Sequence, residues 1–212
     1  EVSDAVNQVV VVGQMLGLAG PAGIVKTGGL RPGDKVVQVG VAPVEGAAVM
    51  AELFSCRLSD VAPGQLAAAR FAIESPGISV VGSALLAAEL GACALHDPTE
   101  GGLSAGLHEM AQTSGLGLVV DEPSVLWFPP GIEICKALGA DPWSTLASGA
   151  LLAGFAASRV QHALNALAKA GFQAAVIAEA RVGSGVLLSS GNALLYSERD
   201  ELSRLAETDI SH

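Results

Sequence analysis

The sequence predicts an α+β fold in which a mixed β-sheet is covered by helices. Segments with helical spacing of apolar residues alternate with short apolar runs over the first two thirds of the chain. The last third instead places several apolar runs in succession. Continuous alternation would favour a doubly wound parallel sheet, so the consecutive runs near the end favour a mixed sheet. Glycines follow several of the helical segments, where they are typical helix ends.

Short apolar or β-branched runs between turn residues are expected to be strands. In chain order they are Val9–Leu18, Lys35–Val39, a run that starts at Cys93, Leu116–Val120, Ala150–Ala156, Ala174–Ala178, Val186–Ser189 and Ala193–Tyr196. Glycine and proline cluster at residues 20–23 and 31–34, which are expected to be turns.

Segments with apolar residues three and four positions apart are expected to be helices. They are Pro43–Phe54, Ser59–Glu74, Ile78–Leu90, Gly101–Ser114, Pro129–Leu138, Ser158–Ala170 and a last helix for which Ser197 and Asp200 form a capping-type start. Pro76 separates the second helix from the third. Gly115, Gly139 and Gly171 are expected to end the three helices that they follow.

The composition limits the classes of function. With 212 residues, half of them hydrophobic, the chain can bury a large core. Eleven Lys and Arg against 21 Asp and Glu give a net charge of −10, so neither nucleic acid nor an anionic membrane surface is an expected partner. No signal peptide is recognised, and the most apolar window, Ile78–Leu95, is interrupted by Glu89. A cytoplasmic location is expected. The three cysteines, Cys56, Cys93 and Cys135, lack CxxC spacing and are expected to be buried free thiols.

The stretch from His96 to Gly102 joins an expected strand to an expected helix and is the main candidate site. The first amides of a helix have no partner inside it, and the helix dipole leaves about half a positive charge there. Gly101 and Gly102 would let a phosphate approach these amides closely. Thr99 is expected to cap the helix, and Asp97 to bind Mg²⁺ or orient the substrate. The alternative is an ordinary loop in which Asp97 or Thr99 caps the helix and the glycines serve close packing.

Glu100 argues against a bare phosphate at this loop. At about 8 Å and an effective dielectric constant near 20, two unit charges repel by about 2 kcal/mol. The sequence therefore predicts that Glu100 points away or that a metal ion lies between the two charges. No Lys-Ser/Thr pair follows the glycines, so the loop is not a Walker A motif.

Residues 102–106 read G-L-S-A-G, which matches the pattern of a serine hydrolase nucleophile elbow. Asp121 or Asp141 and then His162 follow Ser104 in the required order. An elbow serine lies at the turn directly after a strand, however, whereas Ser104 lies inside an expected helix. Serine hydrolase activity is a further alternative, which rests on the pattern and the residue order alone.

Several motifs resemble the C-terminal half of a known superfamily. They are HDPTEGGL at 96–103, GLGLVVDE at 115–122, CKALGADP at 135–142 and SGALL at 148–152. The superfamily comprises AIR synthetase (phosphoribosylformylglycinamidine cyclo-ligase, PurM), formylglycinamide ribonucleotide amidotransferase, selenophosphate synthetase, thiamine monophosphate kinase and the hydrogenase maturation factor HypE. These segments resemble the HypE branch most, and the resemblance covers about Val9 to Tyr196.

The resemblance implies a protein of two α/β halves that uses ATP to phosphorylate or activate an oxygen of a small substrate. The first half is expected to form a homodimer and to supply most of the ATP and Mg²⁺ site. Residues 1–20 are then the end of that truncated half with a connecting strand, residues 21–205 the C-terminal domain, and residues 206–212 a frayed tail. The fragment alone is expected to be inactive. A non-catalytic phosphate-binding, nucleotide-binding or interaction module of the same fold is the alternative.

Carried over from the family, Asp97, Thr99, Gly101 and Gly102 would face the phosphates of the substrate or the nucleotide. Asp97 and, in the tail of the missing half, Glu1 are the candidate metal ligands.

Two departures separate the chain from the HypE branch. Glu100 stands where those members typically carry arginine, and the chain ends without their terminal cysteine. The hydrogenase role is therefore not carried over to this chain, which is expected to be an AIR synthase-related protein of unassigned substrate.

Overall fold

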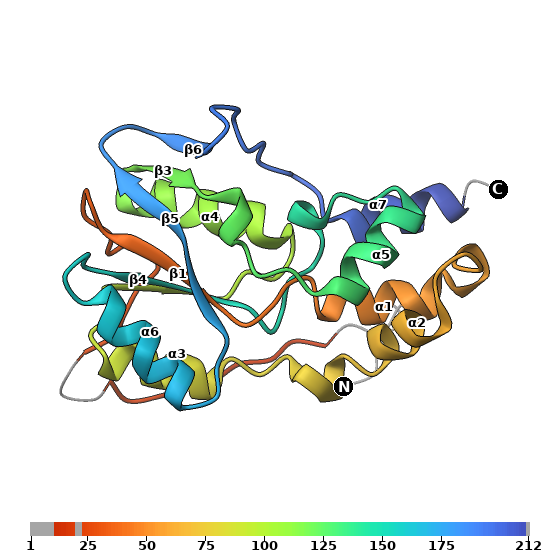
Figure 1. Cartoon of the computed structure of the whole chain (residues 1–212), viewed down its shortest axis with the longest axis horizontal. Helices are drawn as coiled ribbons and strands as arrows, with labels where there is room; N and C mark the ends of the chain where they lie inside the picture. The colour runs from red at the N-terminus through yellow and green to blue at the C-terminus, as the bar shows by residue number, and fades with distance from the viewer. Residues whose placement is uncertain (1–10, 20–22, 211–212) are drawn as a thin grey trace.

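The computed structural model describes residues 11–19 and 23–210. At its centre is one sheet in which six strands lie in the order β2-β4-β1-β5-β3-β6 (Figure 1). The strands are β1 Lys35–Val39, β2 Ala94–His96, β3 Gly117–Val120, β4 Leu151–Phe155, β5 Ala174–Arg181 and β6 Gly185–Leu188. Neighbouring strands pair antiparallel, except that β3 and β6 pair in parallel. The predicted mixed sheet is confirmed.

Seven α-helices accompany the sheet in the described part of the chain. They are α1 Glu45–Leu53, α2 Pro63–Arg70, α3 Val81–Glu89, α4 Gly102–Ser114, α5 Pro129–Leu138, α6 Val160–Lys169 and α7 Glu201–Ile210. Helix α5 has the predicted bounds. The predicted glycine ends of α4 and α5 are also confirmed, because Gly115 and Gly139 both adopt the left-handed conformation with φ of 65°.

Different helices cover the two faces of the sheet (Figure 1). Helix α4 packs on one face, where Leu103, Leu107 and Met110 are fully buried in the core. Their spacing of four and three residues places them on one side of the helix, as predicted. Helices α3 and α6 pack on the opposite face, where Ala87 and Leu167 are fully buried. The sheet therefore has a helical layer on each side.

Helices α1, α2, α5 and α7 form a separate helical group at one end of the sheet, on the right in Figure 1. Their shared core includes Met50, Ile134 and Leu205, each at most 2% exposed. Leu205 belongs to α7, so the last helix is anchored by burial of its apolar side. This anchorage matters for the candidate site, which contacts the start of α7.

Two predicted strands are wrong. Residues 11–19 form no helix or strand and their side chains are exposed; the first part of the predicted Val9–Leu18 strand lies outside the described residues. A strand needs a neighbour that supplies hydrogen-bond partners, and apolar content alone does not provide one. The predicted strand Ala193–Tyr196 is reduced to one bridge between Ala193 and Leu187. The carbonyl oxygens of Leu194 and Leu195 instead form hydrogen bonds with side chains of α4.

The predicted frayed tail overlaps the last helix. Helix α7 continues to Ile210, so residues 206–210 are helical, and residues 211–212 lie outside the described residues. The turn predicted at 20–23 falls mostly outside them too, whereas the turn at 31–34 is confirmed. There the amide of Arg31 donates to Asp34 Oδ2 at 2.8 Å, and Gly33 adopts φ of 91°.

Among the described helices, none taken singly is long and apolar enough to cross a membrane. The bent pair formed by Pro63–Arg70 and Ile73–Glu89 meets the same test, by length and composition only.

Candidate functional site

The candidate loop joins β2 to α4, as the sequence predicts. Its two glycines adopt left-handed conformations, with φ of 76° at Gly101 and 65° at Gly102. Gly101 is the N-cap of α4 and provides no side-chain cap. The prediction that the Thr99 side chain caps the helix is therefore wrong. Thr99 acts through its carbonyl oxygen, which accepts from the amides of Gly102 at 3.0 Å and Ala147 at 3.1 Å.

Close packing explains why residue 102 is glycine. A Cβ there would lie 2.5 Å from the carbonyl oxygen of Trp143, 2.6 Å from that of Thr145 and 2.9 Å from the amide nitrogen of Thr145. All three atoms belong to the backbone and cannot move aside easily. The segment around the short 3₁₀ helix Pro142–Ser144 therefore fits against the first turn of α4 only when residue 102 has no side chain.

The amide of Gly101 is occupied by a carboxylate from the C-terminal part of the chain. It donates to Asp200 Oδ2 at 2.8 Å, while the other oxygen, Oδ1, accepts from the amide of Leu202 at 2.8 Å. Asp200 is 8% exposed. Of the capping-type start predicted for Ser197 and Asp200, only Asp200 caps the last helix, whereas the hydroxyl of Ser197 accepts from the amide of Arg199 before the helix begins. Both glycine amides that were predicted to hold a phosphate, those of Gly101 and Gly102, thus already have acceptors within the protein.

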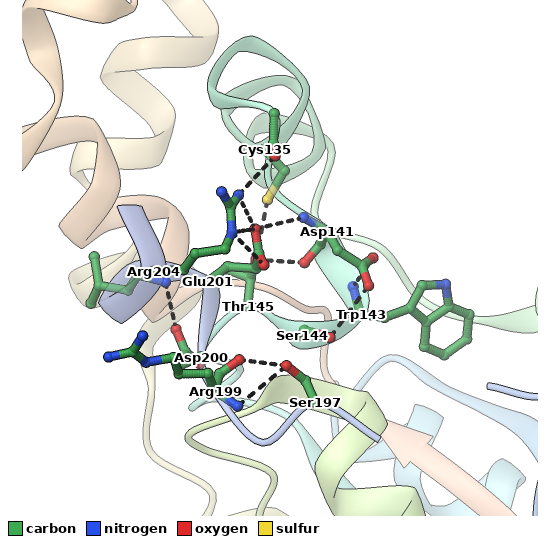
Figure 2. A network of polar contacts seen from close by, with 12 residues as sticks. Cys135, Asp141, Trp143, Ser144, Thr145, Ser197, Arg199, Asp200, Glu201 and Arg204 are labelled. Carbon is green, nitrogen blue, oxygen red and sulfur yellow. Dashed lines mark hydrogen bonds and ion pairs between the residues drawn. The ribbon is translucent and has the colours of Figure 1, made fainter. Parts of the chain in front are cut away.

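Opposing contributions act on the charged form of the Asp200 carboxyl at this junction. Burial raises the pKa of the Asp200 carboxyl above its ordinary value, and the nearby carboxylates of Glu100 and Glu201 raise it further. The hydrogen bonds from the amides of Leu202 and Gly101 oppose this rise without cancelling it. Figure 2 shows Asp200 within a wider polar network at the start of α7, which includes Glu201 and Asp141.

Asp97, Thr99 and Glu100 are exposed, while Pro98 between them is buried. The loop thus presents carboxylate and hydroxyl oxygens to solvent from a backbone that is held on both sides. In the described residues no group of three His, Cys, Asp or Glu side chains is arranged to hold a metal ion. Asp97 is therefore one oxygen donor rather than part of a complete cage. The other predicted metal ligand, Glu1, lies outside the described residues.

His96 fixes the start of the loop against α4. Its Nε2 lies 2.7 Å from Glu109 Oε2, and its Nδ1 lies 3.4 Å from the hydroxyl of Thr27. Gly106 leaves room for the ring, because a Cβ at that position would lie 3.1 Å from His96 Cδ2 and 2.8 Å from Pro98 Cβ. Sequence reasoning missed this arrangement; the glycine one turn before Glu109 is the signal that could have indicated it.

The serine hydrolase alternative is wrong. Ser104 is fully buried in the first turn of α4, and its hydroxyl donates to the carbonyl oxygen of Leu195 at 2.6 Å. A nucleophile must reach a substrate, whereas this hydroxyl is buried and already donates a hydrogen bond within the protein. His108, one turn further on, has its Nε2 2.8 Å from the carbonyl oxygen of Leu194. Both side chains hold the C-terminal segment on α4.

Replacing Ser104 tests this assignment. We expect Ser104→Ala to lower the free energy of unfolding by about 1 kcal/mol, because the carbonyl group of Leu195 loses its donor. Urea denaturation measures the change. The unmodified protein is expected to remain unlabelled by a fluorophosphonate probe, and covalent labelling of Ser104 would contradict the structural role.

The prediction for the cysteines holds in part. All three are free, but Cys56 is exposed, Cys93 is partly buried and Cys135 is buried. Burial raises the pKa of the Cys93 and Cys135 thiols to about 11, and Asp34 adds to the rise at Cys93. These two thiols are therefore poor nucleophiles at neutral pH.

The fold and the loop define a class: an α+β domain with one mixed sheet, whose hydrogen-bonded strand-to-helix loop has exposed acidic and hydroxyl side chains. The chain belongs to the family described as AIR synthase related protein, C-terminal domain, whose sequence model matches residues 31–188. This confirms the family and the fold that the sequence motifs indicated.

Solved structures with the same fold include E. coli HypE, a hydrogenase maturation protein, with a TM-score of 0.67 and 24% identity over 84% of this chain and 54% of that one. A HypE in complex with ATP matches with a TM-score of 0.62 and 21% identity, over 85% of this chain and 55% of that one. Thiamine-monophosphate kinase from Stenotrophomonas maltophilia K279a gives 0.61 and 16%, over 80% and 54%. The chain thus spans little more than half the length of these proteins. No curated protein matches it.

Proposed function

We propose that this chain is the C-terminal half of an ATP-using enzyme that phosphorylates or activates an oxygen of a small substrate. Its His96–Gly102 loop would present Asp97 and Thr99 to a phosphate-bound magnesium ion. The observation that carries the proposal is the contrast between an immobilised backbone and exposed oxygen-bearing side chains on it. Such preorganisation is typical of groups that position a ligand.

Charge favours a metal-bound phosphate over a bare one. Asp97 and Glu100 are exposed carboxylates on the same loop, and the chain carries a net charge of −10. A phosphate without a counter-ion would be repelled, whereas Mg²⁺ prefers carboxylate and hydroxyl oxygens and usually bridges one or two protein carboxylates to phosphates. When bound, the ion would neutralise charge on the phosphate.

The glycines would serve this loop through their conformation. Gly101 and Gly102 permit the left-handed turn and the close packing, while their amides donate to Asp200 and Thr99. We therefore place the phosphate contact on the outward side chains of the loop, with Gly101 and Gly102 shaping it.

Similarity to a HypE that binds ATP supports a nucleotide as the ligand. The rest of the site is expected in the half of the protein that precedes this domain, which would supply most of the ATP and Mg²⁺ contacts. We also propose, as parts of the same interpretation, that the full-length protein is a cytoplasmic homodimer and that this domain alone is inactive.

A binding titration tests the proposal. Asp97→Asn in the full-length protein should weaken Mg·ATP binding about tenfold, or about 1.4 kcal/mol, because a neutral amide is a poorer ligand for the ion. Isothermal titration calorimetry measures the affinity. Glu89→Gln is the matched control, since Glu89 is an exposed carboxylate on α3, across the sheet from the loop. Equal affinity of Asp97→Asn and the unmodified protein would contradict the role of Asp97.

A non-catalytic module of the same fold is the second candidate. The hydrogen bond from Gly101 to Asp200 favours it, because a protein carboxylate already occupies the position that an anion would take at α4. This candidate predicts no saturable binding of Mg·ATP to the full-length protein, and the same titration separates the two.

A further inference from the structure

The segment from Leu194 to Asp200, which we call the C-terminal strap, is hydrogen-bonded along the N-terminal part of α4. Ser104 donates to the carbonyl oxygen of Leu195, the Nε2 of His108 bonds to that of Leu194, and the amide of Gly101 donates to Asp200. The three positions on α4 are separated by three and four residues, so they lie on one side of the helix. The strap therefore follows α4 over about two turns.

Asp200 connects this strap to two helices at once. One carboxylate oxygen caps α7 through the amide of Leu202, and the other holds Gly101 at the start of α4. A carboxylate is suited to this position because the amides and dipoles of both helix N-termini favour negative charge.

Helix α7 is itself firmly placed. Leu205 is 2% exposed in the core of the helical group. Glu201 accepts from the amide of Asp141 at 3.2 Å, and the guanidinium of Arg204 donates to the carbonyl oxygen of Gly139 at 2.9 Å (Figure 2). The position of Asp200 is therefore set by contacts of α7 with the helical group and with the segment that leads into Pro142–Ser144.

We propose that Asp200 is a positioning residue: through its hydrogen bond to Gly101, the docked α7 holds the His96–Gly102 loop in the geometry in which Asp97 and Thr99 meet the ligand. The expected effect of Asp200 on ligand binding rests on the proposed function, whereas its expected effect on the loop geometry does not. Releasing Asp200 frees the Gly101 amide and lets the exposed side chains reorient, although none of them is altered.

Asp200→Ser separates the two roles of the carboxylate. Serine is a good N-cap, so the amide of Leu202 keeps an acceptor, but its short side chain does not also reach Gly101. We expect hydrogen exchange in the peptide that contains Gly101 to accelerate about tenfold or more, while exchange in α7 and the melting temperature change little. Mg·ATP affinity of the full-length protein should fall about tenfold.

Glu201→Gln is the matched control: Glu201 does not bond to Gly101, and the side-chain oxygen of a glutamine can still accept from Asp141 and Arg204, so α7 stays in place. It should leave exchange at Gly101 and nucleotide affinity within about twofold. Unchanged exchange at Gly101 in Asp200→Ser, or faster exchange over the whole domain, would overturn the inference. If the unmodified protein binds no Mg·ATP, the proposed function fails, and exchange at Gly101 still decides whether Asp200 holds the loop.

Discussion

Gly102→Ala is expected to destabilise the domain by about 3–5 kcal/mol, the sum of overpacking and left-handed strain. The new Cβ would meet backbone atoms of Trp143 and Thr145 at 2.5–2.9 Å, and the residue must keep φ of 65°. Because the obstructing atoms are main chain on a packed segment, relief requires that segment to move away from α4. Urea denaturation of the purified domain measures the loss.

Gly115→Ala is the control for this prediction. Gly115 lies at the other end of α4 with the same φ of 65°, but a Cβ there has no atom within 4 Å. Its substitution should therefore cost only the conformational strain, about 1–2 kcal/mol. If both variants lost the same stability, backbone strain alone would account for Gly102, and the packing argument would be wrong.

Gln38→Glu is expected to cost about 4 kcal/mol at pH 7, because it places an unpaired charge in the core. Gln38 lies on β1 and is fully buried. Its Nε2 donates to the carbonyl oxygens of Gly40 at 3.0 Å and Leu126 at 2.8 Å, and its Oε1 accepts from the amide of Leu126 at 3.0 Å. The glutamate side chain would still accept from the amide of Leu126, but its second oxygen would face the carbonyl oxygens of Gly40 and Leu126.

The cost should depend on pH in a defined direction. Burial raises the pKa of the introduced carboxyl above its unfolded value of about 4.3. The folded state then binds the proton more readily than the unfolded state, so the loss is complete above the folded pKa and shrinks as pH falls toward the unfolded one. Unfolding free energies at pH 5 and pH 7 measure this difference. Gln161→Glu, at an exposed position on α6, should change stability by less than about 0.5 kcal/mol at either pH.

Much of the local structure was predictable from the sequence. The bounds of β1 and α5, the apolar side of α4 and the glycine that ends it follow from propensity and spacing within a few residues. The loop between β2 and α4 was predictable for the same reason, since a strand, two glycines and a helical pattern are adjacent in the chain. The family motifs add the fold, which the family match confirms.

The partners of the loop were not predictable in this way. The local pattern is compatible with Ser104 as a nucleophile. It is equally compatible with the amide of Gly101 as a hydrogen-bond donor to a phosphate. The sequence did indicate Asp200 as a helix cap, but a second acceptor role toward a residue 99 positions away leaves no local signal. The run Ala193–Tyr196 resembles a strand for a similar reason. Its apolar character is visible in the sequence, whereas its hydrogen bonds to Ser104 and His108 of α4 are not.

The order of amino acids by itself determined the approximate positions of most helices and strands, which residues form the core side of α4, and where an acidic, glycine-bearing loop lies between β2 and α4. Only the tertiary structure decided which polar groups of that loop are bonded within the protein and which side chains are exposed to solvent. Gly101, Ser104 and His108 each bond to groups between 86 and 99 residues later in the chain. Folding lays the C-terminal strap over α4, and buried polar groups are nearly always paired, so the outward oxygens of Asp97, Thr99 and Glu100 are what the loop presents to solvent.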